Sequence, residues 1–194
     1  MRGLMVAGAL AVAACGLGGV AQAQPPADDL SGEEYCVYMK LTDTLDYAVV
    51  AEALLAGLDQ DKAQALVKTA GEACIKEYGL SQAQASLASD VGIFGSAADY
   101  LMDELMDDGL TDATLDGIYD VVDEMSDEDL DLIFDGGWRD DVAMKGRMKA
   151  ALIAKGFPDK SPTLDDACLL IEVSVLGLDA VAAYVMGDFD EDQS

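Results

Sequence analysis

The sequence contains no histidine, and it has only 11 lysines and arginines against 38 aspartates and glutamates. The absence of histidine excludes the catalytic triads that use one, histidine-ligated zinc and iron sites, and histidine pH switches. The scarcity of bases argues against nucleic acid and anionic membrane surfaces as partners, because Lys and Arg neutralise the phosphates of both. The formal net charge of −27 therefore argues against polyanionic partners such as nucleic acid and anionic membrane surfaces.

Several catalytic signatures are also missing. The chain has no Ser-x-x-Lys, no Cys-x-x-Cys and no Gly-Lys-Ser/Thr phosphate loop. A glycosidase needs two carboxylates placed across a sugar, but nothing selects a pair here, and one tryptophan and few other aromatics are present to stack on a sugar. We expect the protein not to be an enzyme and to need no cofactor, with a histidine-free hydrolase kept as an alternative.

The apolar residues, 52% of the chain, suffice for a folded core despite the charge, and their spacing predicts helices. The clearest helix runs from Ser81 to Asp107, where Ser81 and Gln84 form a capping box. No strand-like alternation stands out. Apolar side chains recur along this helix at spacings of three and four residues: Leu87, Val91, Phe94, Ala98, Leu101 and Leu105.

Other segments are also predicted to be helical. We expect an antiparallel hairpin of 31–57 and 60–78, a helix capped by Thr111, a short helix at 126–135, a basic helix from Arg139 to Lys155, and an apolar helix from Thr163 to Met186. Charged residues in the last helix argue against a membrane span, because each would cost about 2.5 to 3.5 kcal/mol at mid-membrane. The prediction is an all-α, single-domain bundle of about six or seven helices with a central apolar C-terminal helix. The acids of that helix, spaced by seven, are expected along one solvent-reaching edge: Asp165, Glu172 and Asp179.

The first residues have the pattern of an export signal. Residues 1–23 combine a positive start, an apolar run and a small-x-small site before Gln24. The competing interpretation is a bacterial lipoprotein box that ends at Cys15, in which case that cysteine would be acylated. Cleavage before Gln24 is favoured because the apolar stretch continues past Cys15. Both place the protein in the periplasm or cell envelope of a bacterium. The remaining divisions are a linker at 24–30, a helical domain at 31–187 and an acidic tail at 188–194.

Three cysteines remain after the signal, an odd number for an oxidising compartment. The predicted turn near Gly57 lies midway between Cys36 and Cys74, so the hairpin places these two opposite each other. A bridge between them would contribute roughly 4 kcal/mol in the chain-entropy model. Cys168 is then expected to be a buried free thiol.

Charge is distributed unevenly along the chain. From Glu77 to Trp138 there are 17 acids and no base, whereas Arg139 to Lys160 carries six bases and three acids. Like charges four residues apart destabilise a helix by about 0.2 to 0.5 kcal/mol per pair, so a compensating interaction is expected. A ridge of acids repeats every four residues in the first segment: Asp108, Asp112, Asp116, Asp120 and Glu124.

Three compensations are open for this ridge. It is a solvated face countered by the basic helix, a docking face for a basic partner, or a divalent-cation site. The acids at 127, 129 and 131 have the spacing of a calcium loop, but Leu132 and Trp138 stand where glycine and glutamate are needed, so we assign no metal ligand.

The sequence thus predicts an exported acidic helical binding protein. One version is an inhibitor or immunity-type protein that docks a basic envelope protein through the ridge. The alternatives are a divalent-cation-binding or structural envelope protein and the histidine-free hydrolase.

Overall fold

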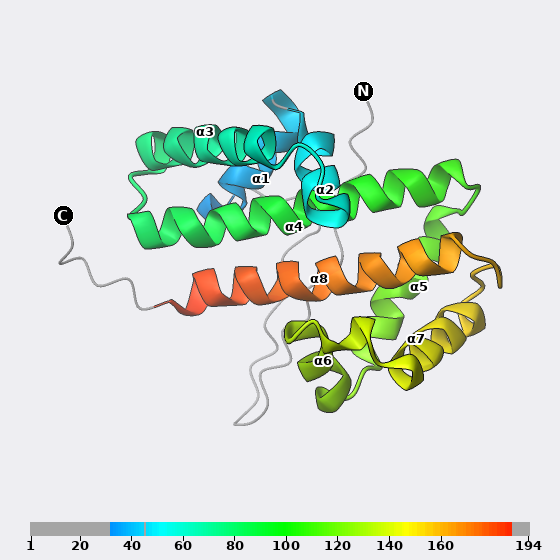
Figure 1. The fold of residues 1–194 in the computed structure, drawn as a ribbon. Coiled ribbons are helices and arrows are strands. Elements are labelled where there is room, and N and C mark those ends of the chain that lie inside the picture. The colour runs from blue at the N-terminus through cyan, green and yellow to red at the C-terminus, as the bar shows by residue number, and fades with distance from the viewer. Residues whose placement is uncertain (1–31, 45, 188–194) are drawn as a thin grey trace.

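The computed structural model describes residues 32–44 and 46–187. The predicted signal peptide with Cys15, the linker and the acidic tail lie outside these residues. Within them the chain forms eight α-helices and two short 3-10 helices, and no strand occurs in these two ranges (Figure 1). The predicted all-α bundle is confirmed.

The helices follow one another with short connections. The order is η1 (Glu33–Tyr35), α1 (Cys36–Thr44), α2 (Tyr47–Ala56), α3 (Gln60–Tyr78), α4 (Gln82–Asp107), α5 (Asp112–Asp123), α6 (Asp127–Phe134), η2 (Gly137–Arg139), α7 (Val142–Ala154) and α8 (Thr163–Met186).

Helix α4 begins where its sequence predicts. The Ser81 hydroxyl accepts a hydrogen bond from the Gln84 backbone N–H at 3.2 Å, and the Gln84 side chain accepts one from the Ser81 backbone N–H at 2.9 Å. These bonds satisfy two backbone donors that a helix start leaves unpaired. Val91, Leu101 and Leu105 of the predicted apolar stripe are buried.

The two longest helices, α4 and α8, form an antiparallel pair at the centre of the bundle, with α1–α3 packed on one side and α5–α7 on the other (Figure 1). The pair is in contact at Gly177, where an added Cβ would lie 3.5 Å from the Cβ of Phe94, an ordinary van der Waals distance. Among the described helices, α8 is the one long and apolar enough to cross a membrane by length and composition. Ile171, Val173 and Val175 are nevertheless buried, so α8 is the predicted central helix.

The buried residues form two clusters. We call the first the disulfide core; it lies between α1, α2, α3 and the first half of α4, and Tyr184 of α8 completes it. The second, the α5–α8 core, lies between the second half of α4 and helices α5 to α8, and includes Trp138 and Phe157. Because α4 and α8 contribute to both clusters, they join the two halves of the bundle.

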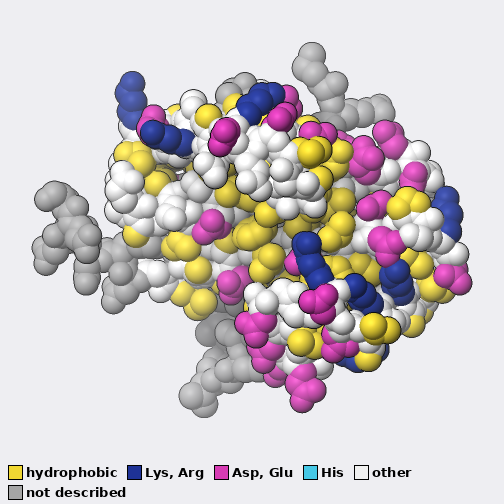
Figure 2. Space-filling model, in the orientation of Figure 1, with side chains coloured by type: hydrophobic (Ala, Val, Ile, Leu, Met, Phe, Trp, Pro, Cys, Tyr) yellow, Lys and Arg dark blue, Asp and Glu magenta, His cyan; other side chains and the backbone are white. Residues whose placement is uncertain are grey.

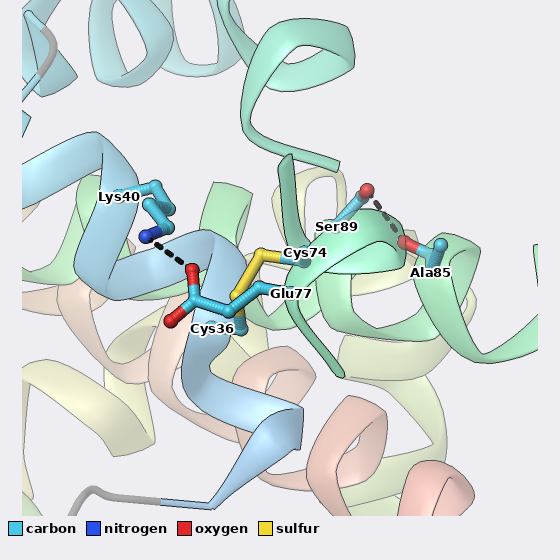
Figure 3. The surroundings of a disulfide bond; sticks show 6 residues. All are labelled: Cys36, Lys40, Cys74, Glu77, Ala85 and Ser89. Carbon is cyan, nitrogen blue, oxygen red and sulfur yellow. Dashed lines mark hydrogen bonds and ion pairs between the residues drawn. A yellow bond between two sulfur atoms is a disulfide. The ribbon is translucent and has the colours of Figure 1, made fainter. Parts of the chain in front are cut away.

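A disulfide joins α1 to α3, as predicted. Cys36 and Cys74 are bonded across a Cα–Cα distance of 6.0 Å, and one turn further along both helices Lys40 forms an ion pair with Glu77 at 2.7 Å (Figure 3). The predicted single helix over 31–57 is wrong in detail: α1 ends at Thr44 and α2 begins at Tyr47, with Asp46 in a non-helical conformation.

Candidate functional site

The acidic ridge is not one continuous helix face. Only Asp112, Asp116 and Asp120 lie within α5, whereas Asp108 caps the end of α4 and Glu124 caps the end of α5. The turn at residue 109, where a glycine has φ of +95°, reverses the chain between Asp108 and the rest. The predicted helix end at Asp107 and helix start at Thr111 agree with this break, but the predicted continuous ridge over all five acids does not form.

The basic helix neutralises part of the ridge, which was one of the three expected compensations. Lys155 lies between two ridge members, with its Nζ 3.2 Å from Asp120 Oδ2 and 2.9 Å from Glu124 Oε1. Hydrogen bonds to these carboxylates raise the pKa of Lys155. Asp108 accepts a hydrogen bond from the Thr163 hydroxyl at 2.8 Å. Three of the five ridge residues are thus engaged within the bundle.

The remaining acids of α5 and α6 are exposed. Between Asp112 and Asp135 the chain has ten acids and no base, and α7 pairs three of them: Asp120, Glu124, and Asp129 through Arg147. Figure 2 shows acidic side chains gathered over α6 at the lower edge of this face. Seven exposed acids form no ion pair with another described residue, and we call them the unpaired acids: Asp112, Asp116, Asp123, Asp127, Glu128, Asp131 and Asp135.

The predicted acidic edge of α8 is wrong at its middle member. Glu172 is buried and accepts two hydrogen bonds from Arg139, at 2.6 Å from Nη2 and 3.2 Å from Nε. Asp165 pairs with Lys149, and Asp179 is exposed. The basic segment therefore contacts α8 as well as the ridge. Arg139 itself lies in η2, because α7 begins only at Val142.

A second cluster of titratable groups was not predicted from the sequence. The Tyr38 hydroxyl of α1 donates to Asp99 Oδ2 of α4 at 2.7 Å, and the Tyr47 hydroxyl of α2 donates to Asp103 Oδ2 at 2.9 Å. Burial raises the pKa of Asp99 to about 6, although the Tyr38 hydrogen bond opposes this rise. The partners lie 61 and 56 residues apart. The recurrence of Asp99 and Asp103 one turn apart was the only available signal.

The third cysteine is buried and free. Burial raises the pKa of the Cys168 thiol to about 11, so it remains protonated at neutral pH. Within residues 32–44 and 46–187 no group of three or more His, Cys, Asp or Glu side chains is placed to hold a metal ion. The seven unpaired acids are therefore the most distinctive chemical feature of the described surface.

Comparison with protein-family models, with curated proteins and with solved structures gives no match.

Proposed function

We propose that the protein is an exported helical binding protein that docks a basic protein through the unpaired acids of α5 and α6. The observation that supports the proposal is that the acidic segment from Asp112 to Asp135 is only partly neutralised by ion pairs. The α7 bases pair with Asp120, Glu124 and Asp129, and seven acids beside them in sequence stay exposed.

The arrangement of these acids is unfavourable for the free protein. Asp127, Asp131 and Asp135 follow one another at four-residue spacing, and each such like-charge pair costs about 0.2 to 0.5 kcal/mol. Asp123 and Asp135 also lie at helix C-termini, where the helix dipole disfavours negative charge. A cationic partner would relieve both costs, and the acids would raise its encounter rate at low salt.

The proposed location is the periplasm or cell envelope, on the support of the apolar N-terminal segment and the Cys36–Cys74 disulfide. In this setting the protein acts as an inhibitor or immunity-type protein that covers a basic envelope protein.

Capture from envelope extract at low and high salt tests this function with two charge-matched variants. In the first, Asp116, Asp123 and Asp131 are changed to Asn, which removes three unpaired acids outside the first helical turns. In the second, Asp59→Asn, Asp61→Asn and Glu72→Gln remove three exposed acids around α3. Both variants change the net charge by the same amount.

We expect the wild type and the α3 variant to retain a basic protein at low salt and to release it at high salt. The α5–α6 variant should retain much less of it. Equal retention by both variants would show a diffuse charge effect and would contradict a defined docking surface, and no retention by the wild type would contradict the function itself.

A further inference from the structure

Two tyrosine–aspartate hydrogen bonds tie the bend between α1 and α2 to one face of α4. Tyr38 lies on α1 before the bend and Tyr47 opens α2 after it. Their partners, Asp99 and Asp103, are one turn apart on α4, at 2.7 Å and 2.9 Å from the two hydroxyls. The pair therefore spans the junction between the first two helices.

Asp99 is half-buried beside a close helix contact. A Cβ on Gly95 would lie 2.6 Å from the Tyr38 ring, so α1 lies directly against α4 beside this carboxyl. Asp99 Oδ2 accepts the Tyr38 hydrogen bond, but Asp99 Oδ1 is buried and accepts no hydrogen bond from another described residue. An ionised carboxylate is costly in such a position, and a protonated one costs much less.

The groups that act electrostatically in this cluster are acids and phenols. Helix α1 contributes Tyr38 and Asp43, α2 contributes Tyr47, and the bend before α2 contributes Asp46. Helix α5 contributes Tyr119 and Asp116, and α4 itself contributes Asp103. The charge of Asp103 adds to the desolvation of Asp99. The Tyr38 hydroxyl is the favourable partner of the ionised form.

We propose that Asp99 and its two tyrosine-bearing helices form a proton-controlled latch, in which protonation of Asp99 holds α1 tightly on α4 and ionisation loosens that contact. The latch rests on the cluster geometry and does not depend on the proposed binding function. The latch would make the packing of α1 on α4 sensitive to mild acidity, although the protein has no histidine.

The sign follows from the two states of Asp99. The folded protein holds the pKa at about 6, whereas an unfolded aspartate has a pKa of about 3.9. The folded state therefore binds the proton more tightly, and stability rises as the pH falls through about 6 and is fully gained below about 4. The shift corresponds to roughly a hundredfold change in the folding equilibrium constant.

Urea unfolding at pH 7.5 and pH 5 tests the latch. In the wild type the folding equilibrium constant should rise strongly toward pH 5. Asp99→Asn, which stays neutral at both pH values, should remove most of this rise. Asp107→Asn is the matched control, because it removes one exposed acid from the same helix outside the cluster, and it should keep most of the rise. Equal pH dependence in wild type and Asp99→Asn would overturn the proposal.

Two readouts do not depend on how well the Asp99 variant folds. In the wild type, the Asp99 carboxyl carbon should titrate near pH 6 by NMR, and a midpoint near 4 would overturn the latch. In Tyr38→Phe the ionised form loses its hydrogen bond, so this midpoint should move upward; a downward shift would contradict the cluster geometry.

Amide exchange in α1, corrected for intrinsic rates, should be faster at pH 7.5 than at pH 5, and equal protection at both would exclude the loosening.

Discussion

The contact between Arg139 and Glu172 places a negative charge inside the bundle. The Glu172 side chain is 7% exposed and that of Arg139 is 51% exposed, so the base reaches in from the surface. Two hydrogen bonds from one guanidinium hold both carboxylate oxygens. The pair therefore attaches η2, and through it the start of α7, to the central helix.

Arg139→Ala is expected to destabilise the protein by about 2 kcal/mol, because it leaves a buried carboxylate without its partner. The cost is below that of a fully enclosed pair, since water can enter where the half-exposed arginine was. Urea denaturation of the single variant and of Arg139→Ala with Glu172→Gln provides the measurement. The double variant should recover most of the loss, and a double variant as unstable as the single one would refute the charge argument.

At the scale of a helix, two glycines on different elements should respond in opposite ways to the same substitution. A Cβ on Gly92 of α4 would lie 2.6 Å from Val37 Cγ1, and Val37 is fully buried in α1. A Cβ on Gly146 of α7 would meet no atom within 4 Å. Space therefore decides the outcome, because both sites are helical and neither has a positive φ.

Gly146→Ala is expected to stabilise the protein by about 0.5 to 1 kcal/mol through helix propensity. Gly92→Ala should destabilise it by about 1 to 3 kcal/mol, because α1 must move away from α4. Midpoints of chemical unfolding measure both, and each variant serves as the control for the other. A stabilising Gly92→Ala would show that α1 does not pack on α4 as closely as described.

The limits of α4 and α8 could be predicted from the sequence because their signals are local. The Ser81–Gln84 capping box sets the start of α4, and the apolar run from Thr163 to Met186 matches α8 residue for residue. The break between α1 and α2 had no such signal. The two helices that flank it are held on α4 by the Tyr38 and Tyr47 hydrogen bonds, whose partners lie more than fifty residues away in the chain.

The candidate site was predictable only in outline. The count of acids located the charged segment, since charge is a property of the residues themselves. Which acids remain unpaired depends on where α7 places Lys155 and Arg147, and these ion pairs join residues 18 to 35 positions apart. The seven-residue spacing of Asp165, Glu172 and Asp179 predicts an exposed edge. This prediction fails at Glu172 because spacing along a helix cannot reveal the arginine that contacts it.

Over the whole molecule, the disulfide constrains the half of the bundle that surrounds it. Replacing Cys36 and Cys74 with Ser should lower the free energy of unfolding by about 4 kcal/mol, because the unfolded chain regains the freedom of a loop spanning 38 residue positions. Adding dithiothreitol to the wild type should lower its melting temperature similarly. Cys168→Ala is the control, and this variant should remain sensitive to reductant. If the variant were no longer sensitive to reductant, Cys168 would have to take part in the bridge.

Net charge also acts on the molecule as a whole. The net charge is −27, so repulsion among the acids should outweigh the attraction within the few ion pairs. Raising sodium chloride from about 0.02 M to about 0.5 M should therefore raise the melting temperature, because salt screens this repulsion. Potassium chloride should have the same effect if no specific sodium site is involved. A fall in melting temperature with salt would show that the ion pairs of α7 dominate.

The pairing of α4 with α8 also has a consequence for the order of folding. The chain is synthesised from its N-terminus, so α4 is made well before α8, the last of the described helices. The disulfide core, otherwise built from α1 to α4, also waits for Tyr184. The α5–α8 core therefore cannot close before α8 has been made, whereas the disulfide core lacks a single buried residue until that point.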